Sequence, residues 1–379
     1  MPFDDIQCSP LLVRDGTDNI MQVLSDTDKP TASAQRDMPQ EFLPPRCTFS
    51  AEDWRILARQ WYPVARSVDV KSSPVAVTLL DLELVTYRTP AGVHVARDLC
   101  PHRGVPLSMG CVEGDELVCA YHGLRYAADG QCRKIPAQPE LKPSAKFRLT
   151  VFPAVERYGL VWTCLNPQGG EANLPPMPSW GDPLCQSILP PFVDIAGSAG
   201  RQVEGFVDVA HFAFVHHDAF ADRNRPEVPM YQTEFTDFGL RTEYWSNVSN
   251  YPKALQHLAP DDFSWLRVYE IYPPFCARLT VHFPNEGRLN ILNAASPVSA
   301  RKTRLFVPIT RNFDTTGSLD DVYAFNAQIF AEDQAIVERQ RPEDLPLDMQ
   351  AEAHFAADRT SVGYRRLLRE MGLTMAYAG

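Results

Sequence analysis

Short runs of hydrophobic residues, separated by turn residues, dominate the chain between about positions 75 and 164. Runs of this length are typical of β-strands, and the dipeptide Asp129-Gly130 is typical of a hairpin turn. The pattern predicts a small antiparallel β domain. Its expected strands cover residues 75–80, 83–88, 93–97, 117–121, 148–152 and 159–164.

A Pro- and Gly-rich stretch at 167–191 separates this domain from a mixed second half. There, strand-like runs at 266–271, 278–283 and 304–309 accompany helical patterns at 203–215, 319–341 and 351–371. This order favours an α+β fold with helices flanking an antiparallel sheet. We therefore expect a poorly ordered extension over 1–45, a β domain over 46–167 and a second domain over 168–379.

Composition restricts the classes of function. The chain has 379 residues, of which 45% are hydrophobic and 22% charged, with a net charge of −11. An acidic chain offers no overall attraction to nucleic acid or to anionic membranes, and no stretch approaches the ~18 apolar residues of a membrane-spanning helix. Nine cysteines and no export signal lead us to expect reduced thiols and a cytoplasmic location.

Two Cys/His pairs form the first candidate site. Cys100 and His102 stand in one predicted loop, and Cys119 and His122 stand in another after sixteen intervening residues. Two thiolates and two imidazoles suit either structural zinc or an iron–sulfur cluster. Because each loop supplies one Cys and one His, the order favours a cluster in which both Cys hold one iron and both His hold the other.

The second candidate site is a segment with acids and histidines, Glu204 to His216, on a predicted helix. Glu204, Asp208 and His211 would fall within about 60° of one another on an ideal helix. His216 would lie about 140° from His211, so both rings can reach one metal only if the helix ends or bulges between them.

A carboxylate further along the chain completes this set. Asp333 lies near the centre of the apolar face of the predicted helix at 319–341, where an ionised group needs a strong partner such as a metal ion. Glu332 lies about 90° from that face and reads better as a surface or cap residue. Two histidines and one carboxylate form the facial triad of non-heme iron oxygenases, which leaves positions open for dioxygen.

Both sets of residues resemble the Rieske non-heme iron oxygenases. The match rests on Asp98-Leu-Cys100-Pro-His102-Arg-Gly, on Cys119-Ala-Tyr-His122-Gly, and on the Glu204–His216 segment with the later Glu332-Asp333 pair. Gly205 departs from the Asn usual in that family. The resemblance implies a Rieske [2Fe-2S] domain followed by a helix-grip (START-like) domain with mononuclear Fe(II).

The same resemblance assigns roles to the residues. It implies that Cys100, His102, Cys119 and His122 hold the cluster, and that His211, His216 and Asp333 hold the iron. Asp208 would link His122 of a neighbouring subunit to His211 in a homotrimer. Electrons would come from a separate NAD(P)H-dependent reductase, with or without a ferredoxin, because this chain has no nucleotide-binding glycine fingerprint.

Within the family, the chain looks most like the monooxygenases that include caffeine N-demethylase, vanillate O-demethylase and dicamba demethylase. We therefore expect O2-dependent hydroxylation or N-/O-demethylation of a small aromatic or heterocyclic compound, with no nucleic acid or membrane partner. Arene cis-dihydroxylation by the same two centres is the alternative, and an electron carrier or zinc-stapled binding protein is the alternative outside oxygen chemistry. The sequence does not fix the substrate.

Overall fold

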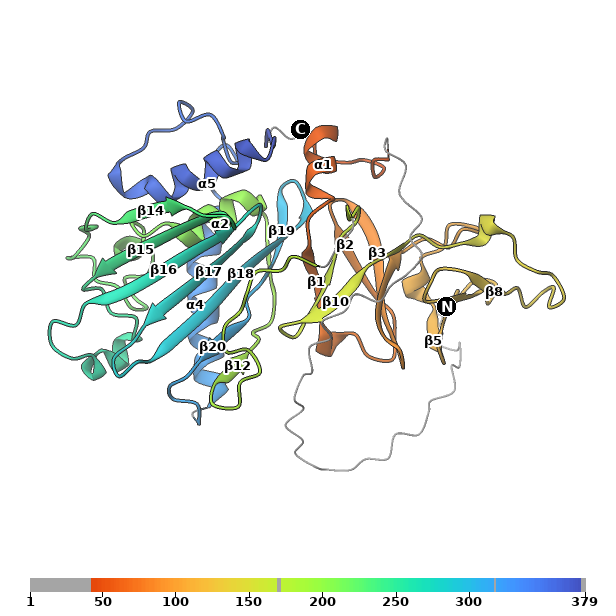
Figure 1. The fold of residues 1–379 in the computed structure, drawn as a ribbon, viewed down its shortest axis with the longest axis horizontal. Coiled ribbons are helices and arrows are strands. Elements are labelled where there is room, and N and C mark those ends of the chain that lie inside the picture. Colours follow the sequence, from red (N-terminus) through yellow and green to blue (C-terminus); the bar gives the residue numbers. More distant parts are fainter. Residues whose placement is uncertain (1–41, 169–171, 317, 376–379) are drawn as a thin grey trace.

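Antiparallel sheets account for most of the architecture in the computed structural model, which describes residues 42–168, 172–316 and 318–375 (Figure 1). The first half of the chain contributes three small sheets. In spatial order their strands are β1 (Tyr62–Arg66), β11 (Leu160–Thr163) and β10 (Ala154–Arg157); β2 (Val75–Leu79), β3 (Leu82–Thr89), β4 (Gly92–Arg97) and β9 (Val151–Phe152); and β5 (Cys111–Glu113), β6 (Glu116–Val118), β7 (Arg125–Ala127) and β8 (Cys132–Lys134).

The second half forms one large antiparallel sheet with nine strands among the described residues. Its main path is β12 (Gln186–Ile188), β20 (Ile309–Arg311), β18 (Arg288–Ser299), β17 (Cys276–His282), β16 (Trp265–Tyr272), β15 (Leu240–Ser246) and β14 (Gln232–Phe235). Beside this path, β13 (Val193–Ile195) pairs with β19 (Lys302–Phe306), which pairs with β18. The expected α+β class is confirmed.

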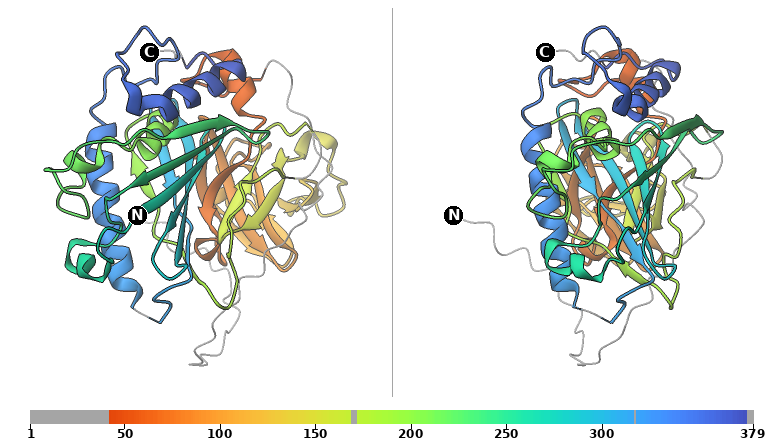
Figure 2. Two further views of the ribbon diagram at one scale, coloured as in Figure 1. Left: turned by 60° about the vertical axis from the view of Figure 1, so that its left-hand side comes forward. Right: turned by 90° about the vertical axis from the view of Figure 1, so that its left-hand side faces the viewer.

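Five α-helices complete the described part of the fold. They are α1 (Ala51–Leu57), α2 (Ala199–Val207), α3 (Phe212–Val215), α4 (Leu319–Val337) and α5 (Arg359–Glu370). Helices α2 and α4 pack together on one face of the large sheet, and α5 lies across its end beside α1 (Figure 2). Three of them begin at a serine whose hydroxyl accepts a backbone N–H of the first turn: Ser50, Ser198 and Ser318.

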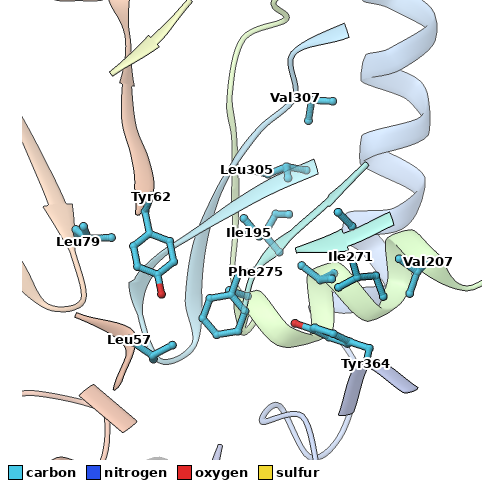
Figure 3. Close-up of a cluster of buried hydrophobic side chains, with 14 of the residues drawn as sticks. Leu57, Tyr62, Leu79, Ile195, Val207, Ile271, Phe275, Leu305, Val307 and Tyr364 are labelled. Atoms are coloured by element: carbon cyan, nitrogen blue, oxygen red, sulfur yellow. The ribbon is translucent and has the colours of Figure 1, made fainter. Parts of the chain in front are cut away.

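The two halves share one hydrophobic core (Figure 3). Tyr62 from β1 lies with its ring centroid 6.3 Å from that of Phe275, in the turn between β16 and β17. Leu57 and Leu79 face the same cluster as Ile271. The chain end adds polar ties, because Asp53 of α1 accepts hydrogen bonds from the backbone N–H groups of residues 374 and 375 at 2.8 Å.

Several boundaries differ from the sequence prediction. The predicted extension over 1–45 lies outside the described residues up to position 41, whereas Phe42 and Leu43 pack against the core, with the Phe42 ring 5.9 Å from Trp54. The longest strand, β18, was not predicted as a strand, because Asn290, Asn293 and Pro297 interrupt its apolar pattern. No helix in the described ranges combines the length and apolarity needed to cross a bilayer.

Candidate metal centres

The two Cys/His loops adopt the same backbone turn. In the first, Cys100 N–H donates to Val105 O at 2.9 Å and Gly104 N–H donates to Cys100 O at 2.9 Å. In the second, Cys119 N–H donates to Leu124 O at 2.9 Å and Gly123 N–H donates to Cys119 O at 3.0 Å. Each turn needs a residue with positive φ four positions after its cysteine, so a glycine stands there, with φ of 73° and 66°.

These turns bring the four predicted ligands together. Cys100 and Cys119 are both buried and lie within hydrogen-bond reach of one another. The rings of His102 and His122 lie with centroids 4.6 Å apart. His102 is half-buried, and its Nδ1 atom is buried with no hydrogen-bond partner among the described residues.

The surroundings favour thiolate at this site. The hydrogen bond with Cys119 lowers the pKa of Cys100 to about 5, helped by the Tyr126 hydroxyl, whose oxygen lies 3.2 Å from Cys100 Sγ. The backbone amides of His102 and Arg103 act in the same direction. The shared proton raises the pKa of Cys119, as expected for two thiols that compete for one negative charge.

A four-donor set of this kind fits a Rieske cluster on structural grounds. The two loops supply a thiolate-prone cysteine pair and a histidine pair with an orphaned ring nitrogen, which is the ligand set of a cluster whose two irons have different ligands. Asp98, just before the first loop, is joined to the segment that follows it. Its carboxylate accepts hydrogen bonds from the Ser108 N–H at 2.7 Å and the Ser108 hydroxyl at 2.5 Å.

The histidine pair lies at one end of the molecule. His122 and the adjoining Tyr121 are exposed, and their rings lie in contact with centroids 3.9 Å apart, tilted by 38°. The sheet that carries these loops, β5 to β8, lies at the opposite end of the long axis from α4 (Figure 1). Within one chain, the Cys/His loops and the histidines near α4 therefore lie far apart.

The second group of predicted ligands converges on one point. His211 Nε2 and His216 Nε2 are 3.1 Å apart, and Asp333 Oδ1 lies 3.1 Å from His216 Nε2 and 3.6 Å from His211 Nε2. In the part of the chain that the structure describes, these are the residues whose donor atoms gather tightly enough to hold a metal ion, all within 4.8 Å. Two imidazoles and one carboxylate at such distances fit a mononuclear iron.

Each imidazole of this group also has a carboxylate on its other side. His216 Nδ1 donates to Glu332 Oε2 at 2.7 Å, and His211 Nδ1 lies 4.0 Å from Asp208 Oδ1. Such partners orient the ring and leave Nε2 free to bind a metal. Sequence reasoning treated Glu332 as a surface or cap residue, which is wrong. The position of Glu332 directly before the candidate ligand Asp333 could have indicated that it lies near the metal site.

The electrostatics of the two histidines differ. Burial lowers the pKa of His211, which favours the neutral imidazole that a metal requires. Burial acts on His216 in the same direction, but the hydrogen bond and charge of Asp333, together with Glu332, outweigh it and raise the pKa of His216.

The predicted helix over 203–215 is broken at Asp208. Helix α2 ends at Val207, and Asp208 has extended backbone angles, φ −72° and ψ 132°. Its carboxylate accepts the N–H of Ala210 at 2.6 Å, so a local side-chain turn replaces the helical hydrogen bonds. The short helix α3 then runs between His211 and His216, its two flanking cap residues. This interruption is what allows both rings to reach one metal, as predicted from their spacing.

The break also changes the role of Glu204, which was expected to share a helix face with Asp208 and His211. Its carboxylate instead binds Arg365 Nε at 2.6 Å and Arg201 Nη1 at 3.2 Å inside the interface of α2 and α5. Gly205, on the same helix, is where α2 approaches α4, since a Cβ there would lie 3.6 Å from Val337.

A cavity of about 610 Å³ opens beside the three converging donors. Helices α2, α3 and α4 line one side, the large sheet lines another, and residues 250–258 also contribute. The cavity is lined by Phe212 and Phe220 from α3 and the segment after it, and by alternate positions along the strands: Arg267, Tyr269, Leu279, Val281, Leu289, Ile291 and Asn293. The intervening positions, such as Asn290, face the other side of the sheet, as the two-residue period of a strand dictates.

Two known families match the chain. The Rieske [2Fe-2S] domain family matches residues 60–153, and the vanillate O-demethylase oxygenase C-terminal domain family matches residues 196–374. The methylxanthine N1-demethylase NdmA of Pseudomonas putida is 31% identical over 319 residues, which cover 82% of this chain and 88% of that protein. The vanillate O-demethylase oxygenase subunit of Pseudomonas sp. is 25% identical over 74% of this chain and 85% of that subunit.

Solved structures agree with these matches. The structure of Pseudomonas putida CBB5 NdmA with caffeine aligns with a TM-score of 0.74 and 29% identity, covering 84% of this chain and 92% of NdmA. A shorter similarity, 37% identity over 115 residues, joins 30% of this chain to 20% of the oxidoreductase NdmD of Pseudomonas putida.

Proposed function

Because this chain belongs to the Rieske non-heme iron oxygenases, we propose that it hydroxylates, or demethylates at N or O, a small aromatic or heterocyclic compound. The observation that carries the proposal is the meeting of His211, His216 and Asp333 at the wall of a cavity, in a chain that also brings two Cys/His loops together. Relatives named as N- and O-demethylases favour this reaction over arene cis-dihydroxylation.

We propose that Cys100, His102, Cys119 and His122 hold the cluster and that His211, His216 and Asp333 hold the iron. When bound, the cluster passes electrons and the iron activates dioxygen. The cluster-binding domain would span 46–167 and the iron-binding domain 168–379, in agreement with the two family matches.

The protein's own residues prepare this chemistry. Glu332 holds the Nδ1–H of His216 and thereby points Nε2 at the metal position. The rings of Phe212 and Phe220 pack around His216, with centroids 6.1 and 5.3 Å from it, and keep bulk water from the ligand nitrogens. Hydroxylation of an N- or O-methyl carbon gives a hemiaminal or hemiacetal, which loses formaldehyde.

Asp208 is proposed as the link between subunits. Its carboxylate lies 4.0 Å from His211 Nδ1 and is about one-third exposed, so it can still accept a hydrogen bond from outside the chain. The cluster loops expose His122 at the far end of the same chain. A homotrimer in which Asp208 meets His122 of the partner subunit would bring the two centres together.

The electron donor is proposed to be a separate NAD(P)H-dependent reductase, a view supported by the similarity to an oxidoreductase, NdmD. The reductase would pass its electrons to this protein directly or through a ferredoxin. A cytoplasmic location is proposed as well, and it suits the eight described cysteines, which form no disulfide with one another.

The proposal is tested by a product screen under ¹⁸O2 with a matching reductase, over methylated aromatics and N-methyl heterocycles. We expect formaldehyde and a demethylated product, or a product with one labelled oxygen, from protein that contains about three irons and two sulfides per chain. A diol with two labelled oxygens would show that the protein is a dioxygenase and not a monooxygenase. An iron-poor, colourless protein whose function survives His211→Ala would show that it is not an oxygenase.

A further inference from the structure

Arg267 is a buried cation without an acidic partner. It lies on β16 and is 1% exposed. Its guanidinium donates only to neutral groups, from Nη1 to the Ser246 hydroxyl at 2.8 Å and from Nη2 to Val248 O at 2.8 Å. With its amide oxygen facing the guanidinium, Asn250 accepts from Nε at 3.2 Å and Nη2 at 2.8 Å. No carboxylate of the described residues lies within ion-pair distance.

The other buried arginines of the described residues behave differently, since each has a carboxylate. The pairs are Arg201 with Glu352 at 2.7 Å, Arg365 with Glu204 at 2.6 Å, Arg311 with Asp314 at 3.1 Å, and Arg278 with Glu270. A guanidinium stays charged at neutral pH, and a buried charge is normally compensated. Arg267 is the exception that needs a counter-charge.

The position of Arg267 indicates where that counter-charge would lie. Arg267 lines the cavity beside the iron ligands, and its guanidinium carbon lies 5.5 Å from the centroid of the Phe212 ring. The Phe212 ring in turn lies 4.9 Å from that of His211. Apart from Asn250, the cavity wall beside Arg267 is largely apolar, with Val281 opposite it on β17, so its field is weakly screened.

Arg267 also has a structural role, because its three partners belong to residues 246–250, which form the last residue of β15 and the segment after it. Fixing that segment requires hydrogen-bond donors but no net charge. A neutral amide side chain could supply donors without the desolvation cost of a buried cation. The segment therefore explains the hydrogen bonds of Arg267. The Phe212 and Tyr244 rings lie 5.5 and 5.8 Å from its guanidinium carbon and stabilise the cation, but no anion among the described residues balances its charge.

We infer that the compound taken up by this cavity is an aromatic acid, whose carboxylate is drawn to the Arg267 side of Phe212 while the reacting methyl group faces the iron ligands. The inference rests on the proposed function and narrows it to one substrate class. It separates this chain from a binder of neutral heterocycles. The anion supplies the charge that the buried guanidinium lacks.

Binding to the metal-loaded protein without reductase tests the inference apart from turnover. Isothermal titration calorimetry would compare matched acids and amides, beginning with 4-methoxybenzoate and 4-methoxybenzamide. We expect each acid to bind at least about tenfold more tightly than its amide. We also expect added salt to weaken the binding of the acids less than it would weaken the binding of an ion at the protein surface. Equal or tighter binding of the amides, or binding of no acid in the panel, would overturn the inference.

Two variants separate charge from structure. Arg267→Gln keeps a donor and removes the charge, so it should abolish the preference for the acid, whereas Arg267→Lys should retain much of it. Arg311→Gln, at a cavity arginine that already has Asp314 as a partner, is the matched control and should keep the preference. An unchanged preference in Arg267→Gln, judged folded by its cluster absorbance and circular dichroism, would contradict the inference.

The wild-type comparison stands even if Arg267→Gln fails to fold. The screen under ¹⁸O2 distinguishes the two proposals. If formaldehyde is released from a neutral substrate and none of the acids binds, the oxygenase function stands and the inference of an aromatic acid as substrate is wrong.

Discussion

Glu332 accepts a hydrogen bond from Nδ1 of His216 at 2.7 Å. The contact joins α4 to the end of α3 and sets which nitrogen of His216 faces the metal position. Glu332 also accepts from Gln328 Nε2 at 2.8 Å, so its carboxylate is held on both sides. A carboxylate–imidazole pair of this kind tunes the ligand as well as orienting it.

Removing this carboxylate should weaken iron binding without removing a ligand. We expect Glu332→Ala to lower the affinity for the mononuclear iron by about 10- to 100-fold. Chelator competition followed by iron analysis measures the change. Asp320→Asn, which removes a carboxylate from the first turn of the same helix, is the control and should retain wild-type affinity. Equal affinities in the two variants would show that Glu332 has no such role.

Loss of a direct iron ligand should be selective. His211→Ala or Asp333→Ala should reduce the iron content from about three to about two per chain and leave the visible absorbance of the cluster unchanged. The adjacent His217→Ala is the matched control, because His217 contacts Phe214 O and Asp218 rather than the donor group. If His217→Ala lost the same iron, or His211→Ala kept it, the ligand assignment would be wrong.

The paired turns around the cysteines predict a different sensitivity. Gly123 has φ 66°, and a Cβ there would lie 3.2 Å from Pro136 Cγ. We expect Gly123→Ala to destabilise the loop by about 1–2 kcal/mol and to lower cluster occupancy. Gly114 has φ 60° with open space around it, so Gly114→Ala carries the backbone cost alone. Thermal unfolding and sulfide content of both variants separate the steric contribution from the conformational one.

The proposed link between subunits can be tested at Asp208. Asp208→Asn should leave cluster and iron contents unchanged while slowing electron transfer between them by more than about tenfold. Stopped-flow absorbance would follow reoxidation of the pre-reduced cluster with substrate and dioxygen. Asp218→Asn, an exposed carboxylate beside His217, provides the control. Product formation at the wild-type rate in Asp208→Asn would exclude the link.

The buried ion network of α2 and α5 predicts a pH dependence of stability. Burial would raise the pKa of Glu352, but hydrogen bonds from Arg201 and Arg365 outweigh it and hold the pKa below the ordinary value. A lowered pKa in the folded state stabilises the fold above the unfolded pKa, and this contribution disappears as the pH falls through the folded value. Glu352→Gln should therefore lower the free energy of unfolding at pH 7 by about 1–3 kcal/mol, measured as a lower urea midpoint.

The stability difference between Glu352→Gln and wild type should narrow below about pH 4.5, where Glu352 begins to protonate in the unfolded wild-type chain. A difference that stays constant from pH 7 to pH 4 would show that the Glu352 charge does not stabilise the network. Glu370→Gln, at an exposed pair with Arg366, is the control and should differ little from wild type at any pH.

Sequence reasoning succeeded where chemistry depends on short spacing. The Cys100–His102 and Cys119–His122 pairs each lie within one turn, so the spacing of the residues was enough to predict two pairs of candidate ligands. Asp333 was found because a carboxylate on an apolar helix face needs a partner. Not every hydrophobic residue of that helix turned out to face the core, because Val337 is buried whereas Ile336 is half exposed.

What sequence reasoning missed depends on contacts between distant segments. The end of α2 at Val207 follows from a side-chain hydrogen bond of Asp208, which competes with a helix that the apolar pattern favoured. The role of Glu332 depends on where α4 meets α3, and the isolation of Arg267 depends on its neighbours across the sheet. No periodicity along the chain encodes such relationships.

The core shared by the two halves restricts how electrons can travel. Carrier domains that swing on a tether need an exposed linker and a small interface, so that they can leave one site and visit another. Here Tyr62 and Phe275 pack in one continuous core, and Asp53 binds the far end of the chain. The domain that carries the Cys/His loops is therefore fixed against the second half of the chain and cannot work as a swinging arm, so the two candidate metal centres of one chain keep their separation.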